Sequence, residues 1–307
     1  IRDVYKRQVR RLILLILVVG ILLAALTAGT GVGYFASLVG ETEPPSREEM
    51  AEAINRLDQQ STLYYASKEP IANVRSDVVR SVASLEDISP HIIQGLISIE
   101  DQNFYDHPGV NPKSTLRAIL QTFLTGSGTG GSTLTQQLVK QQLLTHDVTF
   151  FRKANEILLS LRLEKYFSKD EILTAYLNVS PFGRNNKGEN IAGIREASEG
   201  IFGISPADVN LNQAAFLVGL PQNPYTYTPY NQYGERSDDM TAGITRMKNV
   251  LYSMYRNQYI DKDTYDKALQ YDITKDFIKS ESRPKERQTY LYQAVMNAAV
   301  EKIMALN

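Results

Sequence analysis

A series of helix start signals runs through the chain from residue 89 onward and predicts a mainly α-helical domain. Ser89-Pro90 and Asn111-Pro112 each place a capping side chain before a proline, which fits the first turn of a helix. Residues 168–171 (SKDE) form a capping-box pattern before another helix. Further helix starts are expected at Ser132, Arg152, Ser205-Pro206 and Asp261. Because alternating strand patterns are scarce, we expect little β structure.

The N-terminal part of the chain carries an apolar run with no charged residue from Leu12 to Val39. The run exceeds the roughly 20 residues that span a bilayer, so we expect a transmembrane helix over residues 12–39. It directly follows a basic stretch, Lys6, Arg7, Arg10 and Arg11. The positive-inside rule then predicts a cytoplasmic N-terminus, with everything after Gly40 on the outer side of the cell membrane. A cleaved signal peptide is the alternative, and the length of the run favours the anchor.

The composition excludes several classes of function. With 307 residues, of which 43% are hydrophobic, the chain can bury one large core or two small ones. A net charge of -1 and a pI of about 6.4 give no overall basic field, so we expect no nucleic-acid partner. The absence of cysteine excludes disulfides, thiolate zinc sites and a cysteine nucleophile, and three scattered histidines predict no metal site.

The segment EDQNFYDHPG, residues 100–109, places two adjacent carboxylates at the end of an apolar helix. The carboxylate of Glu100 is expected at the lip of a hydrophobic wall, where partial desolvation suits general acid or base work. Considered alone, such a Glu-Asp pair more often caps or solvates a helix end. Asp101 is expected to hold backbone amides or His107, and Phe104 is either a platform for a sugar or, preferably, part of the core.

The segment GGSTLTQQLVK, residues 130–140, predicts a glycine-rich loop followed by a helix. Ser132, Gln136 and Lys140 are four residues apart, so they share one face of that helix. A helix N-terminus behind a glycine loop binds anions through its backbone amides and its dipole. Together with Lys140 it predicts a phosphate or pyrophosphate site, while a polar solvated face is an equally good interpretation.

A third group, Arg152, Lys153 and Glu156, lies at the start of the next helix. Arg152 and Glu156 are four residues apart, a spacing typical of a surface salt bridge. The functional alternative is a cationic pair for a leaving phosphate, with a second carboxylate beside it.

Five motifs appear in the order typical of peptidoglycan glycosyltransferases. They are EDxxFxxHxG at residues 100–109, GGSTLTQQLxK at 130–140, RKxxE at 152–156, EILxxYLN at 171–178 and AAxLxxxPxxP at 214–224. Over roughly residues 60–255 the chain therefore resembles the glycosyltransferase domain (family 51) of a class A penicillin-binding protein, or a monofunctional transglycosylase.

The resemblance implies a lysozyme-like, two-lobed α-helical fold, with a smaller membrane-embedded lobe around residues 110–150. It implies that the chain polymerises lipid II by inverting transfer, with release of undecaprenyl pyrophosphate. Glu100 corresponds to the general base. Glu156 corresponds to a second carboxylate that assists the leaving group, with a divalent cation (Mg²⁺ or Mn²⁺) as a candidate helper and no organic cofactor. The substrate-binding set is Lys140, Arg152, Lys153, Ser132, Thr133, Gln136, Gln137, Asp101 and Phe104. Expected partners are lipid II, the growing glycan strand and cell-wall synthesis proteins.

The expected organisation has five parts. They are a cytoplasmic N-terminus (1–11), the transmembrane helix (12–39), a juxtamembrane linker (40–59), the glycosyltransferase domain (60–255) and a helical linker (256–307) toward a transpeptidase domain beyond Asn307. The chain departs from the family pattern at residues 145–151, which lack an arginine, and at the charged loop 181–190.

Two other functional classes stay open. A lysozyme-like enzyme that cleaves glycans, such as a lytic transglycosylase, would use one acidic residue as general acid. It would have no need of the cationic set Lys140, Arg152 and Lys153. An inactive cell-wall scaffold would be expected to lack Glu100.

Overall fold

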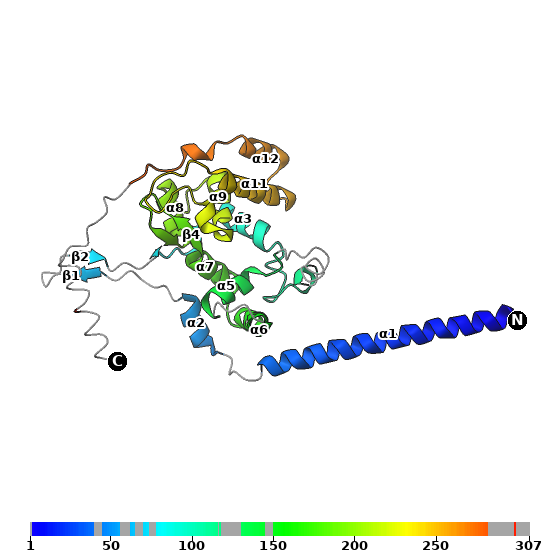
Figure 1. The fold of residues 1–307 in the computed structure, drawn as a ribbon. Coiled ribbons are helices and arrows are strands. Elements are labelled where there is room, and N and C mark those ends of the chain that lie inside the picture. Colours follow the sequence, from blue (N-terminus) through cyan, green and yellow to red (C-terminus); the bar gives the residue numbers. More distant parts are fainter. Residues whose placement is uncertain are drawn as a thin grey trace.

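The computed structural model describes residues 2–39, 45–55, 62–64, 70–73, 78–115, 117, 130–144, 150–281 and 298. The described part is mainly α-helical, as expected (Figure 1). Its helices are α1 (Arg2–Val39), α2 (Arg47–Asn55), α3 (Pro90–Glu100), α5 (Leu134–Gln142), α6 (Phe150–Tyr166), α7 (Lys169–Val179), α8 (Ile194–Phe202), α9 (Leu211–Gly219), α10 (Pro224–Tyr227), α11 (Thr241–Arg256) and α12 (Lys262–Leu269). Short 3-10 turns occur at Leu85–Asp87, Leu220–Gln222 and Ile273–Lys275.

Three of the expected helix starts are confirmed, the helix expected from Arg152 begins two residues earlier, at Phe150, and two starts are wrong. Ser89, Ser168 and Asp261 each cap a helix through the side chain. The helix expected to start at Ser132 starts one residue later, because Thr133 is the residue that forms a capping box, with Gln136. Ser205-Pro206 leads into a turn, and the next helix, α9, begins after Asn210. After Asn111 the chain is helical at 112–115 and 117, and the remainder of that expected helix lies outside the described residues.

Two small sheets accompany the helices. β1 (Thr62–Tyr64) and β2 (Pro70–Asn73) form an antiparallel pair. β5 (Asn190–Ala192) lies between β3 (Val79–Arg80), to which it is parallel, and β4 (Pro181–Arg184), to which it is antiparallel. The charged loop expected at 181–190 therefore contains a strand and the start of another.

The core is built around α3, α9 and α11, which pack against one another although they are far apart in the sequence. In α3 the buried side chains Ile92, Leu96 and Ile97 lie on one face, as the helical period requires. A second group consists of α5 packed against α6 and α7. The last residue of α3 and the first turns of α5 and α6 carry the residues of the candidate site.

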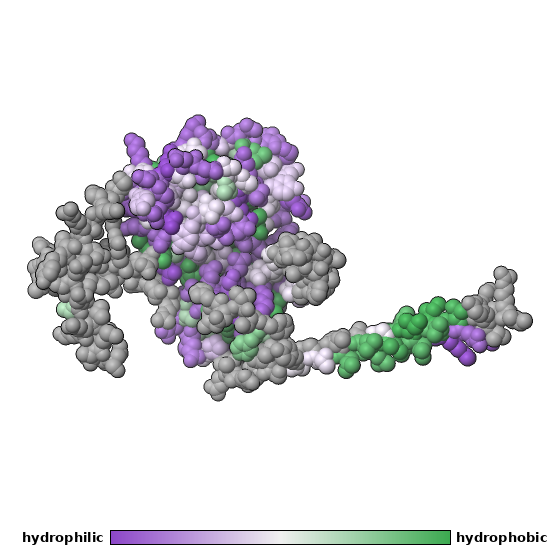
Figure 2. Space-filling view, viewed as in Figure 1, coloured by the Kyte–Doolittle hydropathy of each residue, from purple (hydrophilic) through white to green (hydrophobic). Residues whose placement is uncertain are grey.

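The long helix α1 projects away from the rest of the described chain and contacts α6 (Figure 1). Large apolar side chains are exposed along it from Val9 to Leu26 (Figure 2). Within the described residues, no helix combines the length and the apolar character that crossing a bilayer requires. The expected transmembrane helix at residues 12–39 is therefore not supported by the structure.

The capping box at the start of α7 gives a pH-dependent contribution to stability. Hydrogen bonds from the backbone N–H and then the hydroxyl of Ser168 lower the pKa of Glu171 below its ordinary value. A carboxylate with a lowered folded-state pKa stabilises the fold above its unfolded pKa, and this contribution is lost as the pH falls through the folded value. We expect Ser168→Ala to lower the free energy of unfolding by about 1 kcal/mol at pH 7 and by less at pH 3.

Urea unfolding at the two pH values measures this difference. Ser280→Ala is the matched control, because Ser280 is exposed and caps none of the described helices. An equal loss of stability at pH 7 and pH 3 would contradict the electrostatic part of the argument.

Candidate active site

Glu100 is the last residue of α3, at the edge of the helix face that is buried in the core. Its Oε1 accepts a hydrogen bond of 2.7 Å from Nη2 of Arg246, on α11, and its Oε2 accepts one of 3.0 Å from Nε2 of Gln137, on α5. The side chain of Glu100 is 21% exposed and that of Arg246 is 12% exposed. A carboxylate offers about four lone-pair positions, so two remain for a ligand that enters from the exposed side.

Tyr176 extends this chain of contacts to α7. Its hydroxyl donates to Oε1 of Gln137 over 3.1 Å. Burial raises the pKa of Tyr176, and the negative charge of Glu100 raises it further, so the hydroxyl stays protonated. A tyrosine that can donate here sets the orientation of the Gln137 amide, because its oxygen then faces Tyr176 and its nitrogen faces Glu100.

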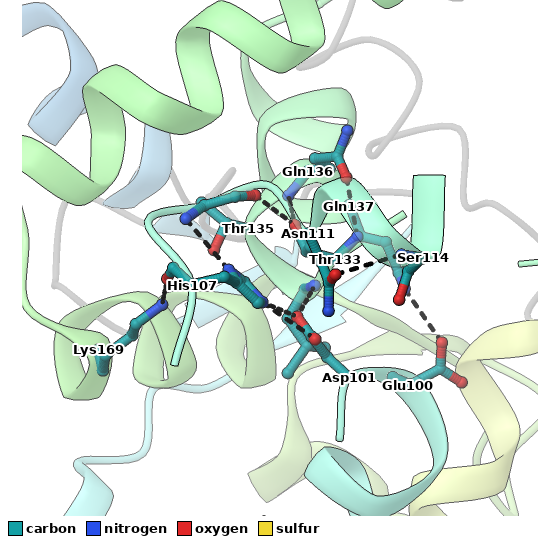
Figure 3. A network of polar contacts seen from close by, with 12 residues as sticks. Glu100, Asp101, His107, Asn111, Ser114, Thr133, Thr135, Gln136, Gln137 and Lys169 are labelled. Atoms are coloured by element: carbon teal, nitrogen blue, oxygen red, sulfur yellow. Dashed lines mark hydrogen bonds and ion pairs between the residues drawn. The ribbon is translucent and has the colours of Figure 1, made fainter. Parts of the chain in front are cut away.

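Asp101 points the other way from Glu100, into the interior (Figure 3). Its carboxylate accepts a hydrogen bond of 3.0 Å from the backbone N–H of Leu134, the first residue of α5. Both of its oxygens lie 3.0 Å from Nε2 of His107. Because the backbone N–H of Gly109 donates to Nδ1 of His107, the ring carries its proton on Nε2 and donates it to Asp101. The expectation that Asp101 holds a backbone amide and His107 is confirmed.

The turn at Gly109 joins this network to α5 and α6. Thr133, the cap of α5, donates its hydroxyl to the backbone oxygen of Gly109 over 2.6 Å. Gly109 has a φ of 94°, and a Cβ there would lie 2.5 Å from the backbone oxygen of Ser160 on α6, so only glycine fits. The close approach holds the segment that follows Glu100 against both helices.

A buried ion pair lies under the same turn. Lys169 donates to the backbone oxygen of His107 over 2.7 Å (Figure 3). It also donates to Glu164 over 2.7 Å, and Glu164 accepts from Thr135 of α5. The ammonium group of Lys169 lies 4.3 Å from the ring centroid of Phe104. The polar groups of Lys169, Glu164 and Thr135 therefore all bind other groups of the protein.

Ser132, Lys153 and Glu156 form a second cluster, where the start of α6 meets the residues before α5. The ammonium group of Lys153 donates to Oγ of Ser132 over 2.9 Å and forms an ion pair with Glu156. The side chain of Glu156 is 3% exposed and that of Lys153 is 40% exposed. The carboxylate therefore lies beneath the cation, and the ammonium group faces outward, where an anionic ligand could meet it.

The two clusters share α5. Gln137, which contacts Glu100, follows the cap Thr133 by four residues, or about 6 Å along a helix axis. Ser132 immediately precedes that cap. The carboxylate of Glu100, on α3, and the ammonium group of Lys153, on α6, consequently both contact residues at or just before the start of α5.

The other predicted site residues are placed differently. Phe104 has no exposed surface and belongs to the core, which decides between its two interpretations. Gln136 is buried, and its side chain accepts from the N–H of Thr133. Lys140 is exposed in the last turn of α5, and Arg152 is half-buried in the first turn of α6.

The prediction of an anion site at the N-terminus of α5 is wrong for two of its amides. The N–H of Leu134 binds the carboxylate of Asp101, and the N–H of Gln136 binds Oγ1 of Thr133. The positive end of the helix therefore stabilises an internal carboxylate. Residues 145–149, in the segment where an arginine was expected, lie outside the described residues, as do 116 and 118–129 of the lobe expected at 110–150.

Sequence reasoning missed Arg246 and assigned no role to Tyr176. Tyr176 lies within the EILxxYLN motif, so its motif could have drawn attention to it. Arg246 lies 146 residues after Glu100, on a helix with no distinctive local pattern. Only the packing of α11 against α3 reveals that it contacts the carboxylate.

The chain is similar in sequence to several known proteins. A family model described as Transglycosylase matches residues 67–255. Penicillin-binding protein 1A of Clostridium perfringens (strain 13) is 35% identical over 256 residues, which are 82% of this chain and 36% of that protein. Penicillin-binding protein 2a of Streptococcus pneumoniae (strain D39) is 34% identical over 284 residues, 92% of this chain and 36% of that protein. The chain thus spans about a third of the length of these relatives. A crystal structure of penicillin-binding protein 1A from Haemophilus influenzae aligns with 80% of this chain and 25% of that chain, with a TM-score of 0.43 and 20% identity.

Proposed function

The chain belongs to the transglycosylase family, with the peptidoglycan glycosyltransferase domains of class A penicillin-binding proteins, and we propose that it polymerises lipid II into glycan strands. The observation that carries this proposal is the position of Glu100. Its carboxylate is held from two sides, is partly exposed, and keeps lone pairs for a hydroxyl group.

In the proposed reaction Glu100 removes the proton from the 4-hydroxyl of the acceptor N-acetylglucosamine. The freed oxygen forms a bond to the anomeric carbon of the donor N-acetylmuramic acid, with inversion. The bond from that carbon to the pyrophosphate breaks, and its electron pair leaves with undecaprenyl pyrophosphate. The proton stays on Glu100 until it passes to solvent, so one proton and one leaving group balance each transfer.

Lys153 is proposed to neutralise the pyrophosphate as it leaves. Support comes from its exposed ammonium group, which Ser132 and Glu156 hold from below. Such a preorganised cation stabilises developing negative charge more than a freely moving lysine does. Lys140 and Arg152 are proposed as further cationic contacts, since both lie on helices that pack together next to this cluster.

A divalent cation was expected from the family resemblance, and the donor set offers poor support for one. In the described part of the chain, no three His, Asp or Glu side chains are grouped so that they could hold a metal ion. The carboxylate of Glu156 is already paired with an ammonium group. These residues do not fit a protein-held Mg²⁺ or Mn²⁺, so no step of the proposed reaction depends on one.

The proposed location is the cell membrane, with the catalytic part on its outer side. The reason is chemical, because the lipid chain of the substrate is anchored in a bilayer and the glycan product lies outside the cell. Other cell-wall synthesis proteins are the expected protein partners, and no nucleic acid is expected.

Incubation of the full chain with labelled lipid II tests the function. We expect glycan polymer and free undecaprenyl pyrophosphate, and no soluble fragments from finished peptidoglycan. Release of such fragments without use of lipid II would instead identify a glycan-cleaving enzyme. Neither activity, from a folded protein, would identify an inactive scaffold.

A further inference from the structure

The guanidinium group of Arg246 is the one cationic group in the described part that directly contacts the carboxylate of Glu100. Three features set this pair apart from a surface salt bridge. The distance is 2.7 Å, both side chains are mostly buried, and 146 residues separate the partners. A contact of this kind costs desolvation on both sides, so it is weak evidence for a purely stabilising role.

The position of Arg246 depends on a glycine in the neighbouring helix, α9. Gly219 ends α9, and a Cβ at that position would lie 2.9 Å from Cγ of Arg246. The absence of a side chain at Gly219 therefore makes room for the aliphatic stem of the arginine. Gly219 has an ordinary helical conformation, with φ of -70° and ψ of -28°, so its backbone would also accept alanine. The requirement for glycine here is set by the position of Arg246.

The burial of Arg246 also has an energetic cost that no hydrogen bond offsets. Its Nε is buried and has no hydrogen-bond partner among the described residues. A buried polar atom in that state has lost its hydrogen bonds to water without replacement, a cost that an apolar residue at the same place would avoid. An arginine kept under these conditions at the carboxylate of a catalytic base points to function.

We propose that Arg246 is a positioning residue for the general base: together with Gln137 it holds the carboxylate of Glu100 in one orientation, ready to accept the proton of the acceptor hydroxyl. This inference rests on the proposed glycosyl transfer. Arg246 supplies the charge that favours the ionised carboxylate, and Gln137, oriented by Tyr176, fixes the second oxygen.

The two residues that bind Glu100, Arg246 and Gln137, have different roles. A base must be deprotonated at the working pH and must point at the proton that it removes. A neutral amide alone would orient Glu100 without favouring its charge. The cation does both, and its planar fork limits rotation of the carboxylate more than a lysine would.

The groups that face Glu100 limit what a pH profile can report. From α11 the charged group is Arg246, and from α7 the titratable group is Tyr176, which stays neutral because burial raises its pKa. The facing residue of α5, Gln137, is neutral, and α9 carries no titratable side chain. The Asp101–His107 pair lies next in the chain and is the same in every variant considered below.

The test compares Arg246→Gln, Arg246→Lys and Gly219→Ala in the full chain, with labelled lipid II as substrate. For Arg246→Gln we expect kcat to fall by about 10- to 100-fold with little change in KM, and the acidic limb of the pH–rate profile to move to higher pH. Arg246→Lys should restore the position of that limb and only part of kcat. Gly219→Ala keeps every charge and should lower kcat several-fold, because it displaces the arginine stem.

The control is Lys248→Gln, which removes an exposed positive charge two residues away on the same helix. It should leave kcat, KM and the pH profile unchanged. Thermal unfolding of each variant separates loss of fold from loss of positioning. If the activity of Arg246→Gln fell only in proportion to its folded fraction, with no movement of the acidic limb, Arg246 would be structural and the inference would be wrong.

The outcomes also separate this inference from the proposed function. Wild-type protein that polymerises lipid II, together with a fully active Arg246→Gln variant, would overturn the role of Arg246 alone. A folded wild-type protein with no polymerising activity would overturn the function, and the positioning role with it.

Discussion

Glu100→Gln is expected to lower the rate of lipid II polymerisation by about 10²- to 10⁴-fold, the largest effect of any single substitution considered. Glutamine has nearly the same shape as glutamate and cannot take up a proton at neutral pH. Its amide oxygen can still accept from Arg246. The loss should therefore appear in kcat, with KM little changed, when initial rates are measured across lipid II concentrations.

The control for this substitution is Glu86→Gln, which neutralises an exposed carboxylate on the 3-10 turn before α3. It should retain wild-type rates. Circular dichroism and thermal unfolding should show that the Glu100→Gln variant is folded. Polymer formation at the wild-type rate by that variant would remove Glu100 from the role of base and leave the family assignment intact.

Asp101→Ala is expected to have the largest effect on stability, lowering the free energy of unfolding by about 3 kcal/mol or more. The substitution leaves two buried donors without an acceptor, the ring N–H of His107 and the backbone N–H of Leu134. Each buried unsatisfied donor costs about 1–3 kcal/mol. The loss of negative charge also removes a favourable interaction with the N-terminus of α5.

Urea unfolding followed by far-ultraviolet circular dichroism measures this change. Asp106→Ala is the matched control, because Asp106 is an exposed carboxylate in the same turn, and it should alter stability by less than about 0.5 kcal/mol. Activity should fall with stability in Asp101→Ala, since α5 also carries Gln137, the partner of Glu100. A variant as stable as wild type would show that the network does not hold the segment 101–109 to α5.

The helical class of the fold follows from local signals that act within a few residues. A side chain such as Ser168 caps a helix through an amide three residues away, so the sequence carries the whole interaction. The same reasoning failed at Ser132 and Ser205. Next to Ser132, Thr133 can also cap the helix, and its bond to the backbone of Gly109 favours it. That bond spans 24 residues and is not visible in a local pattern.

The pair Glu100 and Asp101 shows what the sequence predicts and what the tertiary structure adds. The apolar helix before Glu100 and Asp101, taken together with the other motifs, predicted Glu100 for chemistry and Asp101 for structure. The tertiary structure decided what each contacts: Arg246 and Gln137 for Glu100, and His107 and Leu134 for Asp101. It also showed that the start of α5 is occupied by Asp101, where the sequence alone allowed an external anion.

The sequence by itself determined the family and the mainly helical class, and it predicted residues for the charge and the proton chemistry, because motifs and helix caps depend on neighbours along the chain. Only the tertiary structure decided which of those residues meet. Contacts such as that of Arg246 with Glu100 depend on how α3, α9 and α11 pack, and packing brings together side chains whose separation in the sequence carries no information about their distance in space.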